Sequence, residues 1–323
     1  MGERIYSGKL KKAIALLAAV FILALAANKL ALEAQNAVMT ADADDAGYFQ
    51  GVLSEGMSKG VISQPRLSCQ YYVDKDFKRS LKAAVPVVRD GRQLIGGIVP
   101  HHLLADSLIS SFFTSISAAE PELVFIVGPN HKRAGSKKVI TGHWDWQTPY
   151  GLLEADDAAV ESLVEGCQAG EDFDLLEVEH SVSSLVPYVK YYMPEARLVP
   201  VILHGNLGIE GSKDLALKIS EAAGSRKWII IGSIDFSHYL PPDAADKMDK
   251  ITLEAIKSGD FKGISRMDND NLDSPPSLMT TLEIMRNKGE YEMKVTGHSN
   301  SAEVSGIYSE STTSYFTILF YEK

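Results

Sequence analysis

The chain has 323 residues, of which 32 are lysine or arginine and 42 are aspartate or glutamate, so its formal net charge at pH 7 is −10. This acidic balance argues against binding of nucleic acid or anionic lipid through a basic surface. The length exceeds that of a common single domain, although α/β domains of about 200 to 250 residues are ordinary. We therefore expect one folded unit, preceded by segments that do not belong to it.

The N-terminus has the composition of an export signal. Four basic residues precede an uncharged apolar run at 13–27, and Ala24-Leu25-Ala26 matches an A-x-A cleavage pattern. The run is shorter than the roughly 20 residues that span a bilayer comfortably. We interpret residues 1–27 as a signal peptide or, alternatively, as an N-terminal membrane anchor; a buried helix fits the basic flank poorly. The protein is then expected to be exported, periplasmic or extracellular.

Residues 28–60 are rich in alanine, aspartate and glycine and show no apolar periodicity, which predicts a linker. A compact domain is expected over 61–323. At its start, apolar stretches at 70–73 and 84–88, closed by the turn pair Asp90-Gly91, predict a β-hairpin.

The only two cysteines are Cys69 and Cys167. In an oxidising compartment they could form a disulfide, and two separate buried thiols are the alternative. No C-x-x-C pair is present, so the cysteines do not resemble a zinc site.

Beyond residue 90, strand-like runs alternate with helical stretches, which is typical of a largely parallel sheet covered by helices. Strands are expected at 94–99, 123–127, 197–203, 228–231 and 314–321. Helices are expected at 107–118, 156–166, 182–192, 213–223, 242–257 and 277–287. The pattern predicts an α/β fold, and no internal repeat, P-loop or GxGxxG motif interrupts it.

Short polar clusters at the ends of apolar runs hold most of the histidines. They are Val99-Pro100-His101-His102, Gly128-Pro129-Asn130-His131, Glu179-His180-Ser181, Asp235-Phe236-Ser237-His238 and Gly297-His298-Ser299-Asn300. Three of the five directly follow β-like runs. Open α/β sheets place their sites beyond the carboxyl ends of the strands, so the clusters predict a metal centre there.

His101 and His131 each follow a buried strand, from which two imidazoles can point into one crevice. Neutral imidazole is a general ligand for transition metals, and a facial triad needs one further anionic ligand. Asp273, Asp235 and Glu303 are the candidates for that ligand. A lone histidine is more often a hydrogen-bonded turn residue, but several at strand ends favour a metal site.

Asp235 and His238 are three residues apart where a strand passes into a loop. A carboxylate in this position can orient an imidazole that acts as an acid or base, because histidine titrates near neutral pH. The alternative is that Asp235 only caps the next helix. His180 is a further catalytic candidate, facing the site while Glu179 or Ser181 caps its helix.

His143 and His204 have no partner in the sequence that suggests chemistry, and we interpret both as structural. The G-x-S-x-G pattern of a serine hydrolase is absent.

Seven motifs then occur in the order found in a known family. They are Ile98-Val99-Pro100-His101, Gly128-Pro129-Asn130-His131, Trp146-Gln147-Thr148-Pro149-Tyr150-Gly151, Glu179-His180-Ser181, Pro200-Val201-Ile202, Ser233-Ile234-Asp235-Phe236-Ser237-His238-Tyr239 and Ser299-Asn300-Ser301-Ala302-Glu303-Val304-Ser305-Gly306. Over roughly residues 90–323 the chain resembles the MEMO family, the B component of the AmmeMemoRadiSam system.

The resemblance implies a fold related to class III extradiol dioxygenases of the LigB type, a three-layer α/β/α arrangement with a largely parallel or mixed central sheet and a non-haem metal. It implies that His101 and His131 are the histidine ligands and that Asp235 and His238 lie beside the metal. His238 would match the acid/base position of the extradiol enzymes.

Two departures from the family matter. The family usually has a Cys-Gly segment that supplies a thiolate ligand, whereas this chain reads Leu272-Asp273-Ser274-Pro275-Pro276. Matching the apolar spacing of the next helix puts Asp273 on the cysteine, while matching the prolines puts Leu272 there and leaves no third protein ligand. The second departure is the export signal, because the family implies mostly intracellular proteins.

Three functions follow from these residues. The first is an iron-dependent oxidoreductase resembling extradiol dioxygenases, with Fe(II) on His101, His131 and Asp273, His238 moving protons and Asp235 orienting it. The second is a non-catalytic metal-binding or redox module of a larger system, and the third is a metal-activated hydrolase. Zn, Cu and Mn are the alternative metals. The expected partner is an unidentified small-molecule substrate or protein, with possible membrane attachment through residues 13–27.

Overall fold

The computed structural model describes residues 64–86 and 91–323. The predicted signal segment 1–27 and linker 28–60 lie outside the described residues. Within the described ranges, no helix has the length and apolarity required to cross a bilayer.

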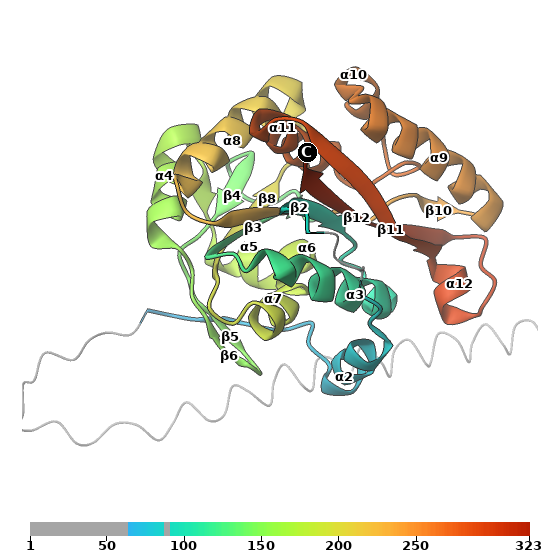
Figure 1. Cartoon of the computed structure of the whole chain (residues 1–323), viewed down its shortest axis with the longest axis horizontal. Coiled ribbons are helices and arrows are strands. Elements are labelled where there is room, and N and C mark those ends of the chain that lie inside the picture. The colour runs from blue at the N-terminus through green and yellow to red at the C-terminus, as the bar shows by residue number, and fades with distance from the viewer. Residues whose placement is uncertain (1–63, 87–90) are drawn as a thin grey trace, which may run out of the picture. The chain divides into compact units, whose positions relative to one another are not determined.

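A nine-stranded mixed sheet forms the centre of the domain, in the order β10-β12-β2-β9-β3-β8-β4-β7 with β11 paired to β12 (Figure 1). Its strands are β2 Leu94–Val99, β3 Leu123–Pro129, β4 Val139–Thr141, β7 Gly170–Glu171, β8 Arg197–Leu203, β9 Trp228–Ser233, β10 His238–Leu240, β11 Tyr291–Asn300 and β12 Thr312–Glu322. The inner strands β2, β9, β3 and β8 pair in parallel, whereas β10, β11 and β12 pair antiparallel at one edge. A small second sheet contains β1 Leu67–Ser68, β5 Trp146–Thr148 and β6 Gly151–Leu153.

Helices cover both faces of the large sheet, which confirms the three-layer α/β/α prediction (Figure 1). One face carries α4 Asp157–Cys167, α8 Gly208–Ala223 and α11 Pro275–Lys288. The other carries α3 Asp106–Ile116, α6 His180–Ser183 and α7 Val186–Tyr192. The remaining helices are α2 Asp74–Ala83, α5 Phe173–Val178, α9 Pro242–Ser258, α10 Phe261–Ile264 and α12 Ser301–Ser305, with 3₁₀ turns η1 Leu103–Ala105 and η2 Ser117–Ala119.

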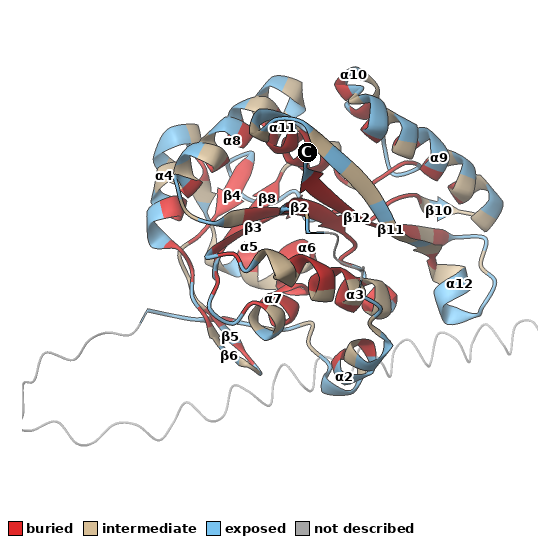
Figure 2. Cartoon of the chain, in the orientation of Figure 1, coloured by how far each residue is buried: buried red, intermediate tan, exposed pale blue. Residues whose placement is uncertain are grey.

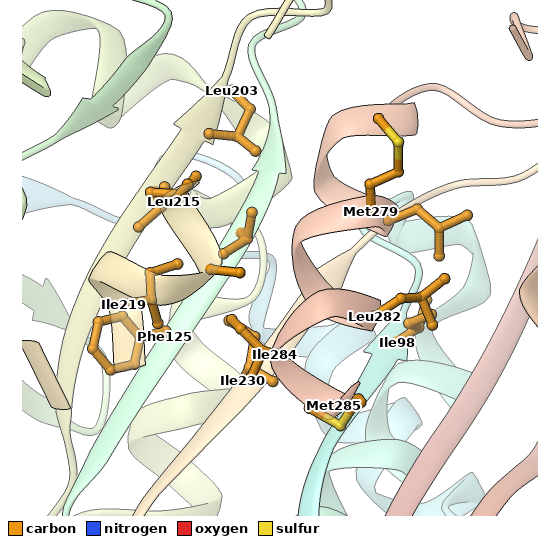
Figure 3. Packing of buried hydrophobic residues seen from close by; sticks show 14 of the residues in the cluster. Ile98, Phe125, Leu203, Leu215, Ile219, Ile230, Met279, Leu282, Ile284 and Met285 are labelled. Carbon is orange, nitrogen blue, oxygen red and sulfur yellow. The ribbon is translucent and has the colours of Figure 1, made fainter. Parts of the chain in front are cut away.

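Side chains along the inner strands point alternately to the two faces of the sheet, so the core has two layers. In β3, Phe125 packs with the α8 and α11 layer, whereas the neighbouring Ile126 packs with the α3 and α7 layer. This is the two-residue period of a strand, with apolar side chains on both faces because both are covered. Figure 3 shows the first layer, and Figure 2 shows that the central strands are buried along their length.

The strand order explains how distant histidines meet. Strand β9 lies between β2 and β3 and is parallel to both, with Val99 opposite Ser233 and Val127 opposite Gly232. The carboxyl ends of the three strands therefore lie next to one another at one edge of the sheet. The residues that follow them, His101, His131 and Asp235, enter the same region.

Two predictions near the start of the domain need correction. The predicted hairpin over 70–88 is wrong for the described residues, because the helix α2 occupies the space between its two stretches. Asp74 and Asp76 lie in the first turn of α2, where acidic groups stabilise a helix, and Phe77 anchors it in the core. The disulfide alternative is also wrong, since Cys69 and Cys167 are free thiols.

Strand β11 was not predicted, and the segment 182–192 is two helices, α6 and α7, instead of one. In β11 most residues are only partly buried, so the strand lacks the apolar run by which we predicted the others.

A buried carboxylate joins the antiparallel edge of the sheet to α9. Asp249 accepts hydrogen bonds from the hydroxyls of Ser237 and Ser314, each at 2.6 Å, and contacts His298 Nε2 at 2.8 Å. The imidazole of His298 stacks on Phe316, with 4.2 Å between ring centroids. The hydrogen bond with Asp249 raises the pKa of His298 above its ordinary 6.5, against the effect of burial.

This pair makes stability depend on pH. A pKa that is raised on folding adds stability that is fully present below the unfolded value and is lost as pH rises through the folded value. His298→Gln should therefore lower the free energy of unfolding most below about pH 6 and progressively less above it. Because the imidazole is 38% exposed, we expect the difference to stay below about 1 kcal/mol.

Urea denaturation of chelator-treated protein across pH 5.5 to 9, a range of roughly three units around the histidine value, measures this difference. His204→Gln controls for loss of an imidazole that has no carboxylate contact. A stability difference between wild type and His298→Gln that does not change with pH would contradict the coupling.

Candidate metal centre

Histidines and carboxylates meet at the carboxyl ends of β2, β3 and β9. His101 is buried just beyond β2, and His131 is partly exposed beyond β3. His180 begins α6, and Asp273 lies in the turn before α11. The structure thus brings together side chains separated by as many as 172 positions along the chain, from His101 to Asp273.

Hydrogen bonds to Ser233 set the orientation of His101. The Ser233 hydroxyl donates a short hydrogen bond to the carbonyl oxygen of Ser181, so its single proton is committed there. Its oxygen lies 2.9 Å from His101 Nδ1, and Nδ1 must therefore be the donor of that bond. This leaves His101 Nε2 pointing toward the carboxylates.

Glu179 orients His131 in the same way. This fully buried carboxylate accepts a hydrogen bond from the His131 backbone N–H at 2.9 Å and lies 2.8 Å from Nδ1 of the ring. It also accepts the backbone N–H of Ser181 at 3.0 Å, which caps α6. A carboxylate on Nδ1 of a histidine fixes the ring and leaves Nε2 for a ligand.

Both Nε2 atoms face one oxygen of Asp273. The distance to Asp273 Oδ2 is 3.2 Å from His101 Nε2 and 3.7 Å from His131 Nε2. His101 Nε2 and Asp273 Oδ1 are buried and have no hydrogen-bond partner. Buried polar atoms are ordinarily paired, so these two are candidates for binding a metal ion.

The ligating atoms form two overlapping groups. Within each group the atoms lie no more than 4.8 Å apart, and His101 belongs to both. The groups are His101, His131 and His180, and His101, Asp235 and Asp273. Imidazole with carboxylate suits divalent transition metals, and the set therefore fits such an ion. Asp249 and His298 form a third group with Asp246, but there the carboxylate of Asp249 already accepts three hydrogen-bond contacts.

The charged groups in the cluster shift one another's pKa values. Burial lowers the pKa of His131, but the contacts with Asp273 and Glu179 outweigh burial and raise it to about 10. Burial also opposes the charged form of His101, and Asp235 and Asp273 again raise the pKa. Burial and the neighbouring imidazoles of His101 and His131 lower the pKa of His180 to about 4. His180 stacks on His131 with ring centroids 4.2 Å apart.

Asp235 does not orient His238. Its Oδ1 accepts the backbone N–H of His101 at 3.1 Å, and its Oδ2 lies 3.5 Å from His101 Nε2. His238 Nδ1 is buried without a hydrogen-bond partner. The predicted contact between Asp235 and His238 is therefore wrong in this structure, because the carboxylate is committed to the loop after β2.

The remaining candidates lie apart from this cluster. Glu303 is exposed on α12, where it accepts a hydrogen bond from Ser299 at 2.8 Å. His143 contacts Glu171 at 2.7 Å, and His204 Nδ1 accepts the backbone N–H of Asn206. Leu272, the other alignment for the third ligand, is fully buried in the core, while Asp273 reaches the histidines.

Two positioning residues were not predicted. Ser233 appeared only within a motif, and Glu179 only as a helix cap. A signal for Ser233 exists in hindsight, because it is the last residue of β9 and its side chain lies beside the carboxyl end of β2.

The comparisons with known proteins agree with the motifs. A family model described as Memo-like protein matches residues 67–319. A MEMO1 family protein of Caldivirga maquilingensis is 27% identical over 84% of this chain and 97% of that protein. One from Pyrobaculum aerophilum is 27% identical over 74% of this chain and 87% of that protein.

Among solved structures, an uncharacterised protein of Escherichia coli K12 matches 70% of this chain and 99% of its own, at 11% identity and a TM-score of 0.46. The sequence matches confirm the predicted resemblance, and the chain belongs to the Memo-like protein family.

Proposed function

We propose that His101, His131 and Asp273 hold one divalent transition metal, with Fe(II) favoured over Zn, Cu or Mn. The observation that carries this proposal is that two buried atoms, His101 Nε2 and Asp273 Oδ1, have no hydrogen-bond partner. Two histidines and one carboxylate with open positions are the ligand set of non-haem ferrous oxygenases. An aspartate in place of a thiolate also avoids an oxidisable ligand outside the cytoplasm.

We further propose that the protein is an iron-dependent oxidoreductase. The iron would supply a site for dioxygen and for an electron-rich substrate. His238, whose Nδ1 has no partner, lines a cavity together with His131 and Asp273 and would transfer protons to and from the substrate. Asp235 would act as a positioning residue, because it holds the loop that carries His101.

A non-catalytic metal-binding module is the second candidate, and one observation favours it. His180 and Asp235 also lie within ligand distance of the cluster around His101. If both were to bind the ion, few positions would remain for dioxygen or substrate, and the site would store or sense metal without turnover.

Nitric oxide distinguishes the two candidates, because it binds a ferrous site only where a coordination position is open. Chelator-treated protein, reloaded anaerobically with Fe(II), should give the EPR signal of a non-haem iron nitrosyl. His101→Ala should abolish that signal, since it removes a ligand, whereas His238→Gln and the control His204→Ala should retain it. Retained iron with no nitrosyl signal would contradict the oxidoreductase proposal and favour the module.

We also propose that residues 1–27 direct export. The support is the basic flank, the apolar run and the A-x-A pattern. N-terminal sequencing of the protein from a bacterial host should find a chain that begins just after Ala26. An intact chain in the membrane fraction would establish the anchor instead of the signal peptide, and an intact chain in the cytosol would contradict export.

A further inference from the structure

A cavity of about 210 Å³ opens beside the proposed metal ligands. His131, Asp273 and His238 line it, together with Arg133, Tyr239 and Asn269. The cavity therefore brings Arg133 together with the predicted acid/base histidine and two of the predicted ligands.

Hydrogen bonds within its own loop hold the backbone on both sides of Arg133. The Asn130 side chain donates from Nδ2 to the carbonyl oxygen of Ala134 at 2.7 Å and accepts the Ala134 backbone N–H at 3.3 Å. Between them, Arg133 adopts a left-handed backbone with φ of +49°. Residues other than glycine rarely adopt this backbone conformation, and it persists where the surrounding structure imposes it.

Tyr239 has the same backbone property on another segment that lines the cavity. Its φ is +61°, and the residue is 69% exposed. Only four residues other than glycine have positive φ in the described ranges 64–86 and 91–323, and two of them line this one cavity. Strained backbone conformations cluster at active sites and ligand-binding sites.

Within residues 64–86 and 91–323, the charge of Arg133 is not neutralised by an acidic side chain. No carboxylate in the described part of the chain forms an ion pair with its guanidinium, although the protein as a whole carries a charge of −10. Arg226, by comparison, contacts Asp156 at 2.7 Å and two backbone carbonyls. Arg133 lines the cavity, and a planar guanidinium whose donors have no carboxylate partner in the described residues is suited to binding a carboxylate with paired hydrogen bonds.

We propose that Arg133 binds the carboxylate of a small organic substrate whose remainder occupies the cavity toward His238 and the metal centre. The inference deepens the proposed function by naming the substrate class. It rests on the proposed function only for which end of the substrate reacts at the metal. The position of Arg133 and its loop does not depend on a bound metal.

The test uses 4-fluorobenzoate as the probe and neutral 4-fluorobenzamide as its matched comparison, each followed by ¹⁹F NMR on the full chain. Wild-type protein should bind the carboxylate more tightly than the amide. Arg133→Gln should weaken carboxylate binding about tenfold or more and leave the amide unchanged. Lys132→Gln, which removes a charge from the adjacent residue, controls for general electrostatics and should change little.

Running each protein both zinc-loaded and chelator-treated separates this proposal from the metal proposal. A loss in Arg133→Gln in both states supports the arginine site even if metal binding by His101 fails. Binding that requires zinc and is unaffected by Arg133→Gln would show that the carboxylate binds the ion, and would overturn the inference. No binding of the carboxylate, or tighter binding of inorganic phosphate at the same arginine, would overturn it as well.

Discussion

Strand β9 lies between β2 and β3, and the three run parallel in register. The meeting of His101, His131 and Asp235 depends on this arrangement. It places the ends of three strands side by side, so that His101 and Asp235 meet across one strand pair and His131 lies one strand further on. Apolar side chains on both faces of these strands fix the register, because a shift of one residue would move each buried side chain to the opposite layer.

The site so formed is costly for the protein to keep empty. His101 and Asp273 are both buried, and each leaves an atom without a hydrogen bond. Burial of charged groups is unfavourable unless they are paired, and the contacts at 3.2 Å and 3.7 Å between the imidazoles and Asp273 offset part of that cost. A divalent ion would displace the protons from the imidazoles. Its positive charge would then be bound by the lone pairs of the imidazoles and of Asp273. Glu179 and Ser233 contact the Nδ1 atoms of His131 and His101 and thereby leave the Nε2 atoms available to a metal ion.

The sequence predicted the regular part of the fold well. Strands at 94–99 and 197–203 match β2 and β8, because continuous apolar runs are characteristic of strands covered on both faces. The predicted hairpin at the start of the domain was wrong, because a turn-like dipeptide outweighed the acidic helix start at Asp74 and Asp76. Strand β11 was missed because it pairs only with β12 at the edge of the sheet, and most of its residues are only partly buried.

The site was predicted in part for the same reason. His101 and His131 converge as the strand ends suggested, since position along a parallel strand determines position in space. Asp273 lies in the turn before α11, and the resemblance to the family suggested it. The individual contacts between atoms could not be predicted from the sequence. Asp235 three residues before His238 suggested a local pair, yet the folded backbone turns that carboxylate to the amide of His101. Ser233 and Glu179 act across long separations that no spacing rule encodes.

The most direct measurement of the central claim is the metal content of the purified chain, by elemental analysis without chelators, for wild type, His101→Ala, Asp273→Ala and the control His204→Ala. We predict close to one iron per chain in wild type and in His204→Ala, and almost none in the other two. Absence of metal from the wild type, or full metal in Asp273→Ala, would show that these residues do not form the site.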